Sequence, residues 1–113
     1  MKKVVWSVTV LGLVAFANTA SAQDKGAKVF SEHGCPMCHS IAGKGNVKGE
    51  LDDVGSKLTP AEIRSWITDP AGNAAKAKAE RKPPMAAMQA KFKDLSKQDL
   101  DDLVAYLAAQ KKK

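Results

Sequence analysis

The most regular pattern of hydrophobic and polar positions lies near the end of the chain. Five apolar residues recur there at spacings of three and four, which places them on one face of an α-helix: Leu100, Leu103, Val104, Leu107 and Ala108. Ser96 precedes this stripe as an N-cap, with Asp99 at the third helical position in a weaker form of the capping box. The lysines at 111–113 follow it, where positive charge suits the helix dipole. We therefore predict a final helix that begins after Ser96.

A second helix is predicted in the middle of the chain. Residues 59–62 (Thr-Pro-Ala-Glu) combine an N-cap, a proline at the first helical position and a glutamate that closes a capping box. Ile63, Trp66 and Ile67 follow at helical spacing. The helix should end at Asp69-Pro70, because the residue before a proline avoids the helical region.

A third, shorter helix is predicted over residues 24–34. Asp24 is its expected N-cap, and Ala27, Phe30 and Ser31 share one face at helical spacing. Gly34 should end it.

The remaining segments predict loops. Residues 40–57 contain four glycines and no periodic apolar pattern. Residues 71–82 are rich in alanine and lysine, and we expect a loop with one helical turn there, followed by an extended Pro83-Pro84. No alternating run in residues 23–113 indicates a strand. The pattern as a whole predicts an all-α domain of three to four short helices joined by long loops.

The start of the chain predicts a secretory signal peptide over residues 1–22. Two lysines precede a mostly apolar run over residues 4–17, and Ala20-Ser21-Ala22 is a small-residue cleavage site. The alternative is an uncleaved membrane anchor, but the run is shorter than the roughly 20 residues of a spanning helix and polar residues interrupt it. We expect cleavage after Ala22, a periplasmic product and no stable membrane insertion.

The mature chain, residues 23–113, would be one small domain with a limited apolar core of its own. The formal net charge is +6, and loss of Lys2 and Lys3 lowers it by two to +4. Such a mildly basic protein suits acidic patches on protein partners. Nucleic acid is not expected as a partner, because no basic helix is interleaved with aromatic residues.

Cys35-Pro36-Met37-Cys38-His39 has the spacing used for covalent attachment of a c-type haem. Cys35 and Cys38 would each form a thioether to one vinyl group of the haem. His39 would then lie under the porphyrin, where a ring nitrogen can bind the iron as the proximal ligand. A haem in the centre of the domain would also supply apolar volume that so short a chain lacks.

Three other functions for these cysteines are weighed against haem. An exported protein often pairs its cysteines in a disulfide. A thioredoxin-like redox pair needs a βαβ context, which is missing here. A four-ligand zinc site needs two more ligands, and His33 and His39 are the only histidines. The histidine directly after the second cysteine favours haem.

The iron needs a sixth ligand unless its distal position is open. His33 lies two residues before Cys35 and can hardly reach the opposite face, so a surface role is expected for it. Met37 is held between the anchoring cysteines, on the wrong side. Met85 and Met88 remain, and we prefer Met85 because Pro83-Pro84 stiffens the segment that presents it. The alternative is that both methionines fill the core.

Two further residues are expected near a haem. The second ring nitrogen of His39 should donate a hydrogen bond to a backbone carbonyl, which we place near residues 49–51. Trp66 would pack beside the haem or donate its indole N–H to a propionate. It is equally well explained as a core residue of its helix.

With these motifs in order, the chain resembles a small bacterial class I cytochrome c over nearly all of residues 24–109. The resemblance rests on residues 26–30, 35–40, 66–70, 82–85, 95–96 and 103–107. It implies the cytochrome c fold around one covalent haem c, with His39 and a downstream methionine as axial ligands. It also implies that the first and last helices cross, with Gly26, Phe30 and Tyr106 in contact, and that one haem edge is exposed. Such proteins commonly have a proline where this chain has Glu50, after Gly49.

The function expected from these observations is one-electron transfer by a soluble, exported, monomeric monohaem protein between respiratory redox partners, without enzymatic activity. A haem protein with an open sixth position, acting as a gas or peroxide sensor or as an enzyme, is the alternative. A haem-free protein with a structural disulfide is the third possibility.

Overall fold

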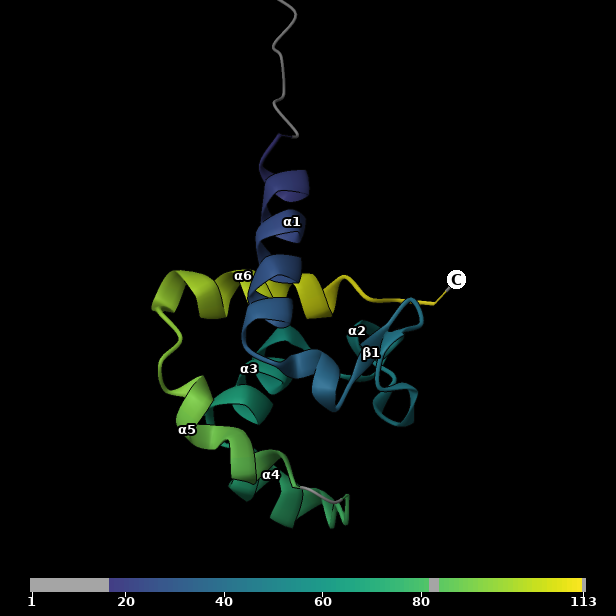
Figure 1. Cartoon of the computed structure of the whole chain (residues 1–113), viewed down its shortest axis with the longest axis vertical. Coiled ribbons are helices and arrows are strands. Elements are labelled where there is room, and N and C mark those ends of the chain that lie inside the picture. The colour runs from purple at the N-terminus through teal and green to yellow at the C-terminus, as the bar shows by residue number, and fades with distance from the viewer. Residues whose placement is uncertain (1–16, 82–83, 113) are drawn as a thin grey trace, which may run out of the picture.

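The computed structural model describes residues 17–81 and 84–112, and it is mainly helical (Figure 1). The described part contains six α-helices: α1 (Ala17–Glu32), α2 (Val54–Lys57), α3 (Pro60–Thr68), α4 (Pro70–Ala77), α5 (Gln89–Phe92) and α6 (Lys97–Ala108). The 3₁₀ turns are η1 (Cys35–Met37), η2 (Val47–Gly49) and η3 (Met85–Met88). The all-α prediction is confirmed, although the helices outnumber the three or four expected. None of the described helices has the length and apolar character needed to cross a membrane.

The core is formed mainly by α1, α3 and α6. Both capped helices begin where the sequence predicts: Thr59 and Glu62 form the two hydrogen bonds of a capping box at 3.2 and 3.1 Å, and Ser96 accepts the Asp99 N–H at 3.0 Å. The apolar faces of the three helices meet, together with Ile41 from the segment between α1 and α3. The buried hydrophobic side chains are Val29, Phe30, Ile41, Ile63, Ile67, Leu103, Val104 and Leu107.

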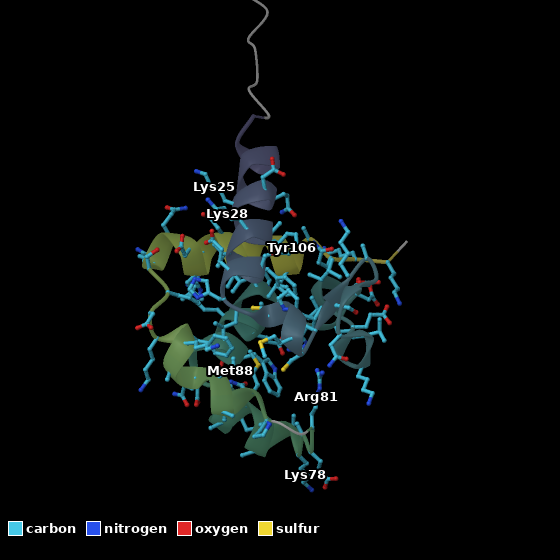
Figure 2. The ribbon with its side chains drawn as sticks, viewed as in Figure 1. Lys25, Lys28, Lys78, Arg81, Met88 and Tyr106 are labelled. Atoms are coloured by element: carbon cyan, nitrogen blue, oxygen red, sulfur yellow. The ribbon has the colours of Figure 1, made fainter. Side chains whose placement is uncertain are left out.

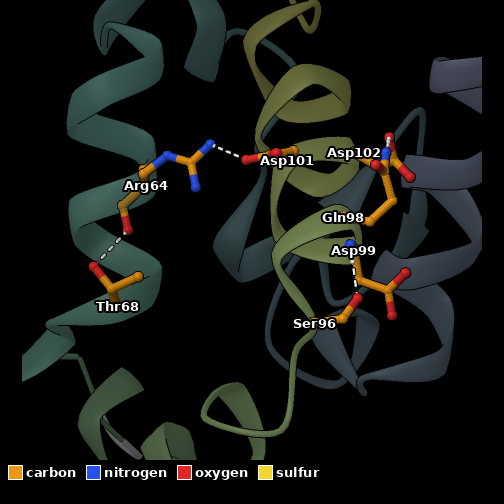
Figure 3. A network of polar contacts seen from close by, with 7 residues as sticks. All are labelled: Arg64, Thr68, Ser96, Gln98, Asp99, Asp101 and Asp102. Atoms are coloured by element: carbon orange, nitrogen blue, oxygen red, sulfur yellow. Dashed lines mark hydrogen bonds and ion pairs between the residues drawn. The ribbon is translucent and has the colours of Figure 1, made fainter.

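Polar contacts fix α3 against α6 at the edge of this core (Figure 3). The Arg64 guanidinium donates to the Asp101 carboxylate at 2.5 Å, joining the two helices. Asp102, which is buried, accepts a hydrogen bond from Gln98 at 3.0 Å within α6. A buried carboxylate is tolerated when it is hydrogen-bonded in this way.

Helices α1 and α6 cross closely, as the resemblance implied (Figure 1). A methyl group on Gly26 would overlap the Cβ atom of Tyr106 and the carbonyl oxygen of Asp102. The rings of Phe30 and Tyr106 meet edge to face, with centroids 6.0 Å apart and planes inclined at 63°. Gly26 therefore sets how near the two backbones approach.

Substitution of Gly26 by alanine is expected to destabilise the protein. Overpacking costs about 1–3 kcal/mol, which exceeds the roughly 0.5–1 kcal/mol that alanine gains over glycine inside a helix. Thermal or denaturant unfolding should show a lower free energy of unfolding for G26A. Lys25, which is exposed on the same helix, provides the control K25A. Equal stability of G26A and K25A would contradict the close crossing.

The beginning of α1 differs from the prediction. The helix starts at Ala17, so Asp24 lies inside it and is not its N-cap. Alanines at 17, 20 and 22 favour a helix, and no glycine or proline lies between residue 17 and Asp24 to stop it. At the other end Gly34 adopts a left-handed φ of 74°, as a helix-ending glycine does. The predicted signal peptide, residues 1–22, falls largely on residues 1–16, which lie outside the described residues, and it stays a prediction.

Two predicted loops contain regular structure. Strands β1 (Ser40–Ile41) and β2 (Lys44–Gly45) form an antiparallel ribbon, contrary to the expectation of no strand. Its turn residues Ala42 and Gly43 both have positive φ, as a two-residue hairpin turn requires. Strands this short cannot produce an alternating pattern, so they could not be predicted from the sequence.

Helix α4 replaces the loop expected over residues 71–82. Pro70 occupies its first turn, and the Asp69 carboxylate accepts the Gly72 N–H at 3.1 Å. The Asp69-Pro70 pair thus ends one helix, as predicted, and begins the next, because proline is compatible with a first helical turn. Farther along, Pro84 is extended, with φ −70° and ψ 149°. Pro83 lies outside the described residues.

Candidate functional site

An apolar cavity of about 200 Å³ lies between the turn after α1 and the segment that carries the two methionines. Sulfur atoms gather in this part of the molecule, between the labelled Met88 and Arg81 in Figure 2. The residues singled out from the sequence all line the cavity: Cys35, Cys38, His39, Trp66, Met85 and Met88. The fold therefore brings together two segments that are far apart in the chain.

The first wall is formed by the cysteine-histidine motif, which folds as the tight turn η1. The amides of Cys38 and His39 both donate to the Cys35 carbonyl, at 3.1 and 2.9 Å. This turn places both thiols and the imidazole against the cavity, whereas the Met37 side chain is 68% exposed. The expectation that Met37 is held away from the site is confirmed.

The electrostatics of Cys35 do not suit a thiol redox pair. Burial raises the pKa of its thiol to about 11, and the neighbouring Cys38 adds to the increase. A reactive thiol of a redox protein has the opposite property, a lowered pKa that supplies thiolate at neutral pH. Both cysteines are free thiols in the structure. Within residues 17–81 and 84–112, no three His, Cys, Asp or Glu side chains are grouped to hold a metal ion, so zinc is not supported either.

His39 is held as a metal ligand would be. Its Nδ1 atom lies 3.0 Å from the Gly49 carbonyl oxygen, which confirms the predicted hydrogen bond to the segment 49–51. Burial lowers the pKa of the imidazole; the bond to Gly49 opposes this effect and the charge of Arg81 adds to it. A neutral ring that donates from Nδ1 keeps a lone pair on Nε2, which is the form that binds a metal.

Asn46 supports this arrangement and was not found from the sequence. Its backbone N–H donates to the carbonyls of Pro36 and His39, at 3.0 and 3.1 Å, and its side-chain amide donates to Met37 at 3.2 Å. Its side-chain oxygen accepts the Lys48 N–H at 3.1 Å and so caps η2, which carries Gly49. An asparagine N-cap was the one available signal, but the long-range bonds to the motif could not be seen.

Arg81 is the second residue that sequence reasoning missed. Its guanidinium donates to the Cys38 carbonyl oxygen and lies against Gly49, where a β-carbon would overlap it. It also lines the cavity, although the residue is largely exposed. In the sequence it is one of 18 lysines and arginines, with nothing that distinguishes it.

A second segment, η3, brings both methionines to the cavity. Met85 and Met88 are the first and last residues of the 3₁₀ turn η3, where side chains three positions apart share a face. Both are half-buried and line the cavity, and Met85 also packs against the hydrophobic core. Their placement leaves the choice between them open.

His33 and Trp66 also line the cavity. His33 is half-buried and lines the cavity, so it is less exposed than the surface position expected for it. Trp66 is half-buried on α3 and contacts the cavity from a helix whose other apolar residues are buried. The position of Trp66 is compatible with contact with a haem and with a core role in its helix.

These donors fit a haem. Two thiols, a neutral imidazole and two thioethers line one cavity, and the other lining side chains are mainly apolar. A helical fold with such a cavity defines a c-type haem protein. The sequence also matches the family model described as Cytochrome c over residues 23–111, and the chain belongs to this family. The protein therefore carries one covalently bound haem c, and its activity is haem-based electron transfer with redox partners. Neither a curated protein nor a solved structure matches the chain significantly.

Proposed function

We propose that this protein is a soluble, periplasmic, monohaem carrier that passes one electron at a time between respiratory redox proteins. The observation that supports it most strongly is that His39 and two methionine thioethers line the same apolar cavity. With an imidazole and a thioether available there, a haem iron could have both axial positions filled and none open to substrate.

We assign the roles of the residues as follows. Cys35 and Cys38 would hold the haem through two thioethers, and the Nε2 atom of His39 would bind its iron. Met85 would provide the second iron ligand, with Met88 as the alternative. The bound haem supplies a one-electron couple between ferrous and ferric iron.

The chain's own residues determine how readily that electron moves. The Gly49 carbonyl orients His39, and a methionine on the opposite side favours the ferrous state and so raises the reduction potential. The apolar walls exclude water from the cavity. Because both axial ligands come from positions held by the fold, the geometry should change little on oxidation.

Export and docking complete the proposal. The signal peptide over residues 1–22 would deliver the chain to the periplasm, and cleavage after Ala22 would leave α1 to begin at Gln23. The mature chain keeps a net positive charge, which suits acidic docking patches on the electron donor and acceptor. We expect a monomer, because brief encounters at an exposed haem edge need no permanent interface.

Carbon monoxide separates this function from that of a gas or peroxide sensor. The purified protein should accept and return one electron per chain, and its ferrous form should bind carbon monoxide slowly or not at all, because a methionine occupies the distal position. Visible spectra recorded during a redox titration, and then under carbon monoxide, provide both measurements. Rapid and complete carbon monoxide binding would favour an open distal position.

A further inference from the structure

The residues after α6 lie along the loop that carries Gly49. We call residues 109–112 the C-terminal strap; in Figure 1 this yellow segment runs toward α2 and β1. Its Lys112 ammonium contacts the Glu50 carboxylate at 2.6 Å, and the Lys112 backbone N–H donates to Asp53 at 2.9 Å. The Gln110 carbonyl accepts the Gly55 N–H at 2.9 Å. Three contacts thus join the strap to residues 50–55.

The same loop is bonded on its other side to the segment that contains His39. Gly49 accepts the hydrogen bond from His39 Nδ1 at 3.0 Å. The Leu51 N–H donates to the Ser40 carbonyl at 2.9 Å. Glu50 is the residue between Gly49 and Leu51, which make these two contacts. The strap therefore holds the loop at the position that joins them.

The charges reinforce this arrangement. The backbone N–H of Lys112 lowers the pKa of the Asp53 carboxyl, with a smaller effect from the Ser56 side chain. The ion pair with Glu50 raises the pKa of the Lys112 ammonium group, and the charges of Asp52 and Asp53 add to this increase. The Lys112 and Glu50 side chains are exposed, and an exposed ion pair alone contributes little. The strap therefore acts through several weak contacts made together.

We propose that the C-terminal strap positions the proximal histidine: Lys112 and Glu50 hold the loop so that the Gly49 carbonyl stays against His39 Nδ1. The proposal rests on the function above, because it takes His39 as the iron ligand. A partner on the second ring nitrogen orients the ligand and raises its basicity. A looser loop would weaken that bond, reduce donation to ferric iron and raise the reduction potential.

A charge exchange tests this role in the haem-loaded protein. K112E places two negative charges at the site of the ion pair, and E50K places two positive charges there. The double variant E50K/K112E restores a pair of opposite charges with the two residue types exchanged. K111E changes the same charge at the neighbouring lysine and is the matched control. NMR on the ferrous protein measures hydrogen exchange at the Leu51 amide and at His39 Nδ1, and redox titration measures the potential.

We expect exchange at both sites to be roughly threefold faster in K112E and E50K, with a higher potential. In the double variant exchange should slow again toward the parental rate, with incomplete recovery because an acidic side chain at position 112 still faces Asp52 and Asp53. A chain ending at Ala109 also loses both backbone contacts, and exchange should be roughly tenfold faster. If K112E behaves like K111E, or if the double variant shows no recovery, the strap has no positioning role. Absence of covalent haem from the parental protein would instead overturn the proposed function, and this proposal with it.

Discussion

Replacing both Cys35 and Cys38 with alanine is expected to yield an exported chain without covalent haem. Both thioether positions are lost, and only the iron ligands His39 and Met85 would remain to hold the cofactor. The structural consequence is large, because the cavity that these residues line measures about 200 Å³. At ~24 cal/mol per Å³, an unfilled cavity of this size costs about 5 kcal/mol. That is comparable to the whole stability of many small domains.

The double variant should therefore lose cooperative unfolding as well as colour. Intact mass under denaturing conditions shows whether haem remains attached, and circular dichroism during heating shows whether a cooperative transition remains. M37A lies in the same motif and changes a side chain that is 68% exposed, so it should keep both properties. Covalent haem in the double variant would show that these two cysteines are not the attachment points.

Replacing Met85 with alanine should remove the distal ligand, whereas M88A should retain it. Met85 follows the extended Pro84 and packs against the hydrophobic core, so its position is the better fixed of the two. In M85A we expect loss of the weak far-red band of methionine-ligated ferric haem and rapid carbon monoxide binding. The potential should fall by the order of 0.1 V, within the roughly 0.8 V range that axial ligands control.

The two single variants act as controls for each other, because both shorten a methionine of η3 that lines the cavity. Visible and near-infrared spectra of the ferric proteins, with redox titration, decide the assignment. If only M88A loses the far-red band, Met88 is the ligand. If both variants keep the band, either methionine can take the position or the distal ligand is elsewhere, and M85A/M88A distinguishes these cases.

Local signals in the sequence predicted the parts of the fold that depend on a few neighbouring residues. Thr59 and Ser96 cap helices because their side chains reach backbone amides three positions on. The apolar stripes of α3 and α6 predicted which faces are buried, and the spacing of Cys35, Cys38 and His39 indicated a motif for haem attachment. Each of these inferences needed no knowledge of distant contacts.

Features that depend on distant contacts could not be found in this way. Asn46 bonds to the motif across a hairpin that consists of two-residue strands, too short to give a pattern. Arg81 reaches Cys38 across 43 positions of sequence. The contact of Lys112 with Glu50 joins the end of the chain to a loop whose position only the folded core determines. Met85 and Met88 share one face, so spacing alone cannot separate them.

The intact mass of the unaltered protein, exported and then denatured, tests the central proposal most directly. We predict the mass of residues 23–113 plus one haem, from a red sample whose colour stays with the polypeptide under denaturing conditions. A colourless protein with the mass of its amino acids alone would contradict the account.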